Sequence, residues 1–222
     1  MKRLVFVALL FLLLLPIGYY YLSDQSKTKP LPVINPVDVQ QEMVDPELLR
    51  IGKGHRIGAF RFENQDGNWI TAADMKGKVS VVEYFFTTCK SICPIMNTQM
   101  QRIQKKYANE KDVRIFSFTV DPQTDTVAQM KRYATAHGAK AGQWHFLTGQ
   151  KSDLYSLARR SFFVLKPAEA QNLGDAGSDF IHTNNFVLVD QQLRIRGYYD
   201  GTSPKEVSLL QAHIAQLLAE PH

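Results

Sequence analysis

The feature that most constrains this chain is an apolar run that leads into two cysteines and then into a helix. Residues Lys78–Phe86 are rich in β-branched and aromatic side chains, as expected of a strand buried on both faces. Cys89 and Cys93 follow, and Pro94 favours a helix start because its fixed φ suits a first helical turn. The helical pattern continues to Tyr107. The sequence therefore predicts Cys89 in a strand-to-helix loop and Cys93 at the N-terminus of a helix.

The rest of the sequence alternates between strand and helix patterns. Further strands are expected at Ala59–Glu63, Trp69–Thr71, Val113–Val120, Trp144–Leu147, Asn185–Val189 and Leu193–Tyr199. Further helices are expected at Asp125–His137, at Ser152–Ser161 with Ser152 as its cap, and from the Ser203 cap to about Leu218. The first two strands should form an N-terminal β-hairpin. This order predicts an α/β protein with an open sheet flanked by helices, and a cysteine pair between a strand and a helix is typical of the thioredoxin-like fold.

The N-terminus has the pattern of a membrane anchor. Lys2 and Arg3 precede an apolar run over residues 4–22, which at about 1.5 Å per residue nearly spans a hydrocarbon core of about 30 Å. Tyrosines at 19–21 fit an interfacial aromatic belt. The alternative is a cleaved signal peptide, but its apolar region is usually shorter and ends at small residues. We therefore expect a single anchor helix at residues 1–22.

The expected organisation and location follow from this anchor. Residues 23–51 contain four prolines and are expected to form an extended linker. Residues 52–222 are expected to form the thioredoxin-like domain. Positive charge before the helix places the N-terminus in the cytoplasm. The prediction is a single-pass protein of the bacterial inner membrane, with its soluble domain on the periplasmic or outer side, where thiols can be oxidised.

Charge and cysteine content narrow the possible functions. The formal net charge is +5, but Lys and Arg are scattered among acids without the basic stripe that nucleic-acid binding requires. A disulfide between Cys89 and Cys93 would close too short a loop to stabilise the fold much, so the pair indicates redox or metal chemistry instead. Backbone amides and the positive end of a helix dipole stabilise thiolates at such a position. Two thiolates with a neutral imidazole would suit copper or zinc.

Glu83 is unexpected in a buried strand. An unpaired carboxylate is costly there, and its pKa tends to rise. It lies six residues before Cys89, the offset at which thioredoxins keep a buried acid that assists proton transfer. Two interpretations stay open: Glu83 accepts protons from the thiol pair, or it is an ion-paired or edge-facing residue.

Four motifs follow one another along the chain. They are Cys89-x-x-x-Cys93-Pro94, Val120-Asp121-Pro122-Gln123-Thr124-Asp125-Thr126, Leu147-Thr148-Gly149 and Ile181-His182-Thr183. Together they resemble the SCO/SenC family, the copper-binding accessory proteins of cytochrome c oxidase assembly. The resemblance runs from about Gly52 to the last helix and extends to the N-terminal anchor. It implies a thioredoxin-like fold and copper bound by Cys89, Cys93 and His182.

The resemblance also implies a function and partners. A copper metallochaperone would deliver the metal to the binuclear centre of cytochrome c oxidase subunit II, without catalytic turnover. The alternative is a membrane-anchored thiol–disulfide oxidoreductase that reduces the oxidase cysteines before metallation. Another copper carrier or a thiol reductase would be a further partner. A peroxiredoxin is disfavoured because Val82 and Phe86 stand where that family has Pro and Thr. A structural zinc site is disfavoured because three ligands leave a coordination position open.

Several further residues near the cysteines bear on the expected site. The family usually has Pro-Asp after the first cysteine, whereas this chain has Lys90 and Ser91. A cation beside the metal in place of a carboxylate would weaken copper affinity or change redox behaviour. Asp121 is expected to cap or orient the loop beside the cysteines. Met96 and Met100 could offer thioether ligands to Cu(I), but their spacing favours core positions.

Overall fold

The computed structural model describes residues 15, 29–164 and 183–220. The expected anchor at residues 1–22 lies almost entirely outside the described residues, and so does His182. Within the described ranges, no helix combines the length and apolar character needed to cross a membrane. Residues 31–222 group as one compact unit, and the account below concerns its described part.

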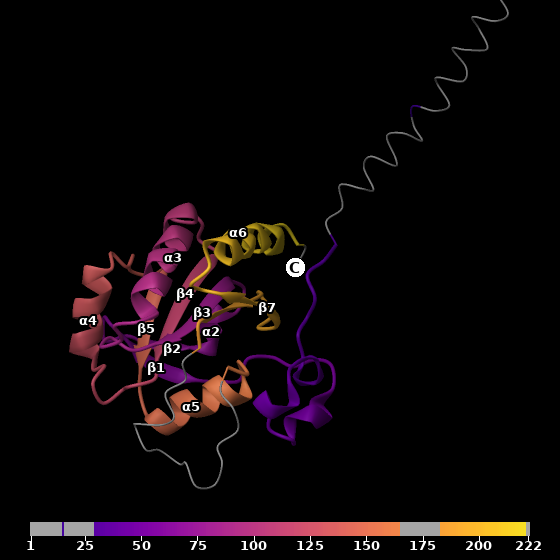
Figure 1. The fold of residues 1–222 in the computed structure, drawn as a ribbon, viewed down its shortest axis with the longest axis horizontal. Coiled ribbons are helices and arrows are strands. Elements are labelled where there is room, and N and C mark those ends of the chain that lie inside the picture. The colour runs from indigo at the N-terminus through magenta and orange to yellow at the C-terminus, as the bar shows by residue number, and fades with distance from the viewer. Residues whose placement is uncertain (1–14, 16–28, 165–182, 221–222) are drawn as a thin grey trace, which may run out of the picture. The chain divides into compact units, whose positions relative to one another are not determined.

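One mixed sheet forms the centre of the described fold (Figure 1). Its strands are β1 (Arg61–Asn64), β2 (Trp69–Thr71), β3 (Val79–Phe85), β4 (Val113–Thr119), β5 (Trp144–Thr148), β6 (Asn185–Val189) and β7 (Ile195–Asp200). Their order is β2-β1-β5-β4-β3-β6-β7. The central strands β3, β4 and β5 are parallel, and the outer strands pair antiparallel. The predicted open sheet with an N-terminal hairpin is therefore confirmed.

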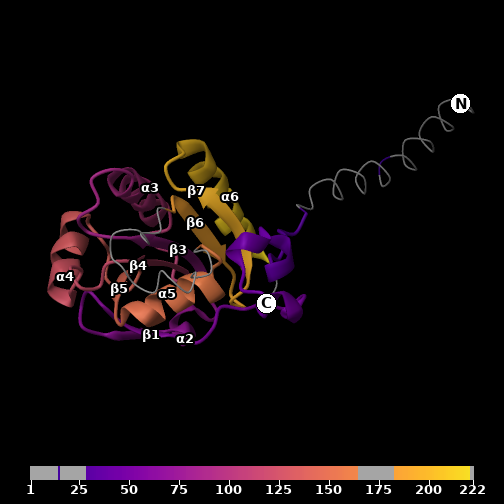
Figure 2. The ribbon, with the colours of Figure 1, turned by 60° about the horizontal axis from the view of Figure 1, so that its bottom comes forward.

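Helices cover both faces of this sheet (Figure 2). They are α2 (Ala72–Met75), α3 (Cys93–Lys106), α4 (Val127–Ala136), α5 (Lys151–Arg160) and α6 (Pro204–Ala219). Every strand and helix expected after residue 52 is present, with ends within two residues of the prediction. The structure also contains one helix that was not predicted, the short helix α2. Its signal is local, because Thr71 and Asp74 form a capping box at its start.

The helix ends follow capping chemistry. Ser203 caps α6 as predicted, since its hydroxyl accepts a hydrogen bond from the backbone N–H of Glu206 at 3.3 Å. The prediction of Ser152 as the cap of α5 is wrong. That helix begins at Lys151 with Gln150 as its N-cap residue, and the Ser152 hydroxyl donates to the Asp153 carboxylate instead.

The two faces of the sheet bury different side chains. The face covered by α3, α4 and α6, here called the α3 face, packs apolar residues of these helices on alternate residues of β3 such as Val79 and Val81. The opposite face, here called the α5 face, packs α2 and α5 on Val82 and Tyr84. Successive strand residues point to opposite faces, so β3 contributes to both cores. This explains why the strand reads as a continuous apolar run.

The segment before the domain differs from the expected linker. Residues 31–51 are not an extended tether, because they contain the 3-10 turns η1 (Pro36–Asp38), η2 (Gln41–Met43) and η3 (Leu48–Ile51). Val44 and Leu48 are buried in the core of the α5 face. The prolines therefore lie in the turns of a packed segment. The apolar residues of this segment pack against the sheet.

Two contacts fix the start of this segment to β7. Ile34 forms an isolated antiparallel bridge with Ile195. The buried Arg196 guanidinium donates to the backbone carbonyls of Leu31 and Pro32 at 2.7 and 3.1 Å. The folded unit consequently begins at about residue 31, upstream of the expected boundary at 52.

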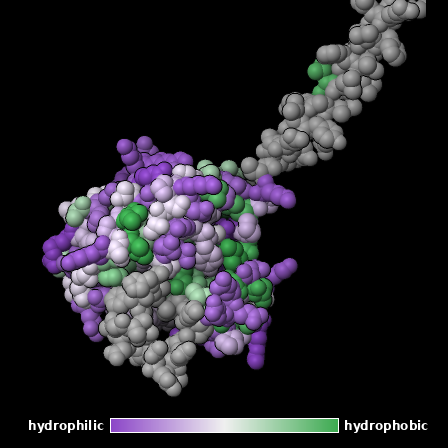
Figure 3. Space-filling view, in the orientation of Figure 1, coloured by the Kyte–Doolittle hydropathy of each residue, from purple (hydrophilic) through white to green (hydrophobic). Residues whose placement is uncertain are grey.

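One face of the molecule can be seen in the space-filling view. Figure 3 shows hydrophilic side chains over most of the visible face, with hydrophobic ones scattered among them. Ile95 is one of the exposed large apolar residues, and it lies in the first turn of α3, close to the cysteines.

Candidate metal centre

The two cysteines lie where β3 gives way to α3. Cys89 is in the connecting loop, and its backbone N–H donates to the carbonyl of Phe86 at 3.2 Å. Cys93 is the first residue of α3, followed by Pro94, as the sequence predicted. Both side chains are buried, with 9% and 4% of their surface exposed, and both are free thiols. The pair is therefore held at the positive end of a 14-residue helix.

The two thiols differ in acidity. Burial acts to raise the pKa of Cys89, but hydrogen bonds from the side chain and backbone of Cys93 and of Ser91 outweigh it and lower that pKa. Burial raises the pKa of Cys93 well above its usual range, and its hydrogen bond to Cys89 adds to this. The Cys89 thiol therefore gives up its proton more easily than the Cys93 thiol does.

The departure from the usual family motif changes the polar surroundings of Cys89. The hydroxyl oxygen of Ser91 lies 3.6 Å from the Cys89 sulfur. Lys90 is exposed. A neutral hydroxyl, rather than a carboxylate, is therefore the polar side chain that contacts this thiol from within the loop.

Glu83 lies on the central strand β3 and is 1% exposed. The Ser117 hydroxyl donates to its carboxylate at 2.6 Å, and the Trp144 indole N–H donates to the Ser117 oxygen at 2.8 Å. Burial raises the pKa of Glu83 to about 7, against the hydrogen bond from Ser117. Its charge in turn helps to raise the pKa of Cys93. Glu83 is therefore neither at an edge nor held by a cation in these contacts, but is a buried acid near the thiol pair.

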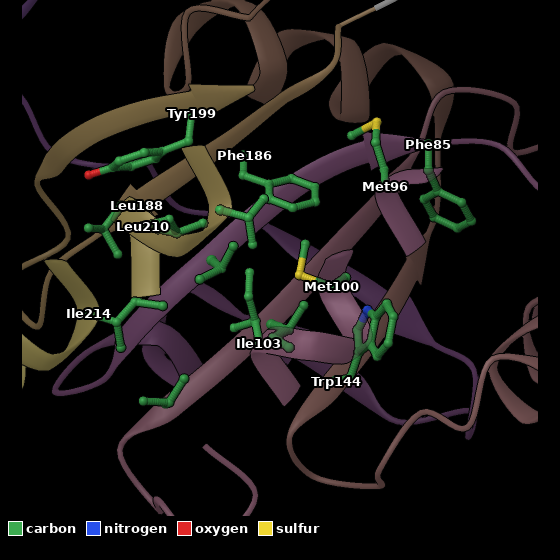
Figure 4. Close-up of a cluster of buried hydrophobic side chains, with 14 of the residues drawn as sticks. Phe85, Met96, Met100, Ile103, Trp144, Phe186, Leu188, Tyr199, Leu210 and Ile214 are labelled. Carbon is green, nitrogen blue, oxygen red and sulfur yellow. The ribbon is translucent and has the colours of Figure 1, made fainter. Parts of the chain in front are cut away.

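The methionines of α3 belong to the core. Met96 and Met100 are 1% and 0% exposed, and they pack in the cluster of the α3 face. Figure 4 shows them among Phe85, Trp144 and Phe186. This is the arrangement that their helical spacing favoured.

The described hydrogen bonds of Asp121 join it to neighbours in sequence, and none reaches the cysteine loop; its backbone N–H donates to the Thr119 hydroxyl at the end of β4 at 2.9 Å. Its carboxylate accepts from the Thr124 N–H at 3.5 Å, and its carbonyl accepts from the Asp125 N–H at 2.8 Å. The contact with the cysteine loop comes from Asp125, which accepts hydrogen bonds from the backbone and side chain of Thr87. Sequence reasoning missed Asp125 as a site residue, although its motif was noted.

Tyr133 of α4 is a second residue that sequence reasoning missed. Its hydroxyl accepts a hydrogen bond from the Asn97 side chain of α3. Burial raises the pKa of the Tyr133 phenol, and the charges of Glu83, Cys93 and Cys89 raise it further. The phenol therefore lies within electrostatic reach of the thiol pair. Nothing in the sequence distinguishes it from an ordinary helix aromatic.

The third expected ligand, His182, lies outside the described residues, immediately before Thr183. Thr183 is buried, and its hydroxyl accepts from the Asn185 N–H at 3.2 Å, just before β6. Among the described residues, no three His, Cys, Asp or Glu side chains gather as a metal site. The described donors of the expected centre are thus the two thiols.

The fold and the site together define a class. A mixed sheet with helices on both faces, and a dithiol between a central parallel strand and the next helix, is a thioredoxin-like protein with its reactive pair in the usual place.

Comparison with known proteins identifies the family. The chain belongs to the SCO1/SenC family, whose model matches residues 50–219. It is 36% identical over 149 residues to the SCO1 protein homolog of Bacillus subtilis, covering 66% of this chain and 75% of that protein. The family predicted from the four motifs is therefore confirmed.

Solved structures agree with this assignment. BsSco, a member of the Sco family of cytochrome c oxidase assembly proteins with a disulfide switch, is 29% identical with a TM-score of 0.63, covering 76% of this chain and 96% of that chain. Copper-bound ScoI of Bradyrhizobium japonicum shares the fold at 22% identity and a TM-score of 0.56, covering 74% of this chain and 99% of that chain.

Proposed function

We propose that this protein is a copper metallochaperone for cytochrome c oxidase assembly, and that Cys89, Cys93 and His182 bind the copper. The observation that carries the proposal is the pair of free, buried thiols at the N-terminus of α3. Thiolate sulfur is a soft donor that suits Cu(I). The membership of BsSco in a family of oxidase assembly proteins supports the proposed role in oxidase assembly. The copper-bound ScoI structure supports copper as the bound metal.

His182 completes the proposed donor set. A neutral imidazole beside two thiolates gives three protein ligands and leaves a position open through which copper can pass to an acceptor. We propose the binuclear centre of oxidase subunit II as that acceptor, with another copper carrier or a thiol reductase acting before it.

Glu83 is proposed as the proton acceptor of the site. A metal ligand must be deprotonated, so copper binding releases protons from the thiols. Cys93 keeps its proton in the copper-free protein because burial raises its pKa. Glu83 is buried nearby with a pKa of about 7, so its carboxylate can take up a proton near neutral pH.

The location is proposed from the sequence pattern. An uncleaved anchor at residues 1–22 would hold the folded unit at the bacterial inner membrane, on the periplasmic or outer side. Oxidase subunits that receive copper would then be within reach. Cell fractionation with protease protection of the full chain tests this placement, and a soluble or cytoplasm-facing protein would refute it.

The test of the copper site is a Cu(I) titration of the reduced full chain in detergent, in competition with a chromophoric chelator. We expect one copper per chain. Cys89→Ser, Cys93→Ser and His182→Ala should each weaken binding, and His213→Ala in α6 should not. Binding that is unaffected by His182→Ala would refute the proposal that His182 is the third ligand. Binding that survives loss of both thiols would remove the site.

A second function is supported by the difference between the thiols. In an oxidoreductase, the Cys89 thiolate would attack a partner disulfide and form a mixed disulfide. Cys93 would then lose its proton and attack the Cys89 sulfur, which releases the reduced partner and leaves a Cys89–Cys93 disulfide. A thiol reductase would regenerate the pair. The disulfide switch of BsSco supports this chemistry. Rapid reduction of a peptide disulfide, alongside weak copper binding that ignores His182, would favour this function.

A further inference from the structure

A buried carboxylate lies beside the cysteine loop without belonging to the proposed ligand set. Asp125 is 0% exposed and follows β4, where it precedes helix α4. Its carboxylate accepts the Thr119 hydroxyl at 2.5 Å and the Thr87 backbone N–H at 3.2 Å, and it also accepts the Thr87 hydroxyl. These donors are an amide and two neutral hydroxyls.

The contacts join the ends of two neighbouring parallel strands. Phe85 of β3 pairs with Thr119 of β4, and Thr87 lies two residues beyond the end of β3. Thr87 is also held from α4, because the Gln129 side chain donates to its hydroxyl oxygen at 3.1 Å. Asp125 therefore anchors the loop at a point two residues before Cys89.

This arrangement costs more free energy than a purely structural contact would require. Burying a carboxylate without a cation costs free energy even when it is hydrogen-bonded. Burial raises the pKa of Asp125, and the hydrogen bonds from Thr119 and Thr87 only partly offset it. Because an anion accepts shorter and stronger hydrogen bonds than a neutral group, the carboxylate fixes Thr87 more firmly than an amide side chain would.

We propose that Asp125 is a positioning residue for the metal centre, which holds the Thr87–Cys89 segment so that the Cys89 sulfur faces Cys93. The proposal deepens the copper function and rests on Cys89 being a ligand. Asp125 itself does not bind the metal. It acts through Thr87, and its loss should leave the thiols present but less well placed.

The experiment compares Asp125→Asn with Asp190→Asn in the full chain. An amide has one acceptor oxygen where the carboxylate has two, so Asn at 125 loses the negative charge and can keep a contact with both threonines only by donating to one hydroxyl. Asp190 is an equally enclosed carboxylate, 1% exposed, that pairs with Arg194 and Arg196 next to the end of β6. Because Val189 pairs with Ser80 at the start of β3, Asp190 lies at the opposite end of that strand from the cysteines.

Two quantities are measured for each variant: amide hydrogen exchange at Thr87 and Cys89 in the reduced, copper-free protein, and Cu(I) affinity. We expect Asp125→Asn to speed exchange at both amides and to weaken copper binding by about 10-fold or more, as for groups that orient metal ligands. Asp190→Asn should lower stability without either change. Unaltered exchange and affinity in folded Asp125→Asn, or equal losses in Asp190→Asn, would overturn the proposal.

Thr87→Val provides a second test of the proposal if Asp125→Asn does not fold. It removes one donor to the carboxylate and keeps the side-chain shape. We expect a smaller change in the same direction, and no additional loss when it is combined with Asp125→Asn, because the two residues act through one contact. Wild-type exchange and affinity in Thr87→Val would refute the proposal. Failure of the wild type to bind copper would refute the copper function, whereas the exchange measurement would still decide the role of Asp125.

Discussion

The two faces of the sheet carry different kinds of core. On the α3 face, the buried residues of β3 and β4 include Glu83 and Ser117, and Cys93 packs in the same cluster. On the α5 face, the buried strand residues are mainly apolar, and Phe118 and Phe162 pack at 5.8 Å between ring centroids. The α3 face therefore holds Glu83 and the Cys93 thiol in an apolar setting that raises their pKa values, whereas the α5 face carries a cluster of aromatic rings around Phe118. The thiol chemistry lies on one side of the sheet.

The largest expected effect is on the α5 face. The Phe118 ring contacts four other aromatic rings, those of Phe60, Phe62, Tyr84 and Phe162. Phe118→Ala should lower the free energy of unfolding by about 3–5 kcal/mol, because it leaves a cavity. Urea unfolding measures this loss, and alkylation rates should show unchanged thiol pKa values. A shifted Cys89 pKa in a folded variant would show that the two faces are not separate.

A smaller effect, dependent on pH, is expected from Glu83 on the α3 face. Burial raises its pKa from 4.5 to about 7, so the folded state binds the proton more tightly than the unfolded state. The stability from this group is full below pH 4.5 and is lost as pH rises towards 7. Glu83→Gln should remove this pH dependence. As the pH rises from 4.5 to 8, its free energy of unfolding should therefore increase by about 3 kcal/mol relative to that of the wild type.

Urea unfolding of the reduced, copper-free protein across this pH range is the measurement. Glu63→Gln in β1 is the control, since Glu63 is only partly buried. A difference between wild type and Glu83→Gln that stays constant with pH would mean that Glu83 ionises normally in the fold.

Two buried serines, Ser117 on the α3 face and Ser80 on the α5 face, allow a direct comparison of the two faces. Ser117 donates to Glu83 and accepts from Trp144, whereas the Ser80 hydroxyl has no hydrogen-bond partner among the described groups. Ser117→Ala should cost about 1–3 kcal/mol and raise the pKa of Glu83 further, since it removes the donor that lowers it. Ser80→Ala should be neutral or stabilising. Equal effects in unfolding experiments would contradict the assignment of polar chemistry to the α3 face.

The smallest expected effect concerns the loop. Hydrogen bonds from Ser91 help to lower the pKa of Cys89. Ser91→Ala should raise that pKa only in part, because the contacts from Cys93 remain. The pH dependence of Cys89 alkylation measures this shift. Ser91→Thr keeps the hydroxyl and should match the wild type, and a rise in both variants would assign the effect to loop geometry rather than the hydroxyl.

The fold was predictable because its signals are local and agree. The apolar run of β3, Pro94 at the start of α3 and the Ser203 cap each specify one element, and the alternation of elements specifies the sheet. The packed segment at 31–51 was not predictable, because its few apolar residues are separated by prolines and make contacts with β7 and the α5 face that are distant in sequence.

The site was predictable only in part. Cys89, Cys93 and Glu83 stand out by residue type and spacing, but the structure alone places Asp125 against Thr87, which lies 38 residues away in the sequence. Sequence proximity favoured Asp121, whose described hydrogen bonds join it to Thr119, Thr124 and Asp125 and do not reach the cysteine loop. The acidity of each thiol also depends on burial and hydrogen bonds that spacing does not reveal.

The contact of Arg196 with Leu31 limits how far the domain can travel. If residues 1–22 are the anchor that we propose, the free covalent length is that of residues 23–30, at most roughly 28 Å, rather than the roughly 100 Å of residues 23–51. Under the proposed anchor, the volume open to the thiol pair would be smaller, and the effective concentration of membrane-bound acceptors around it would be higher. A tether of that length would favour partners that present their copper ligands close to the bilayer.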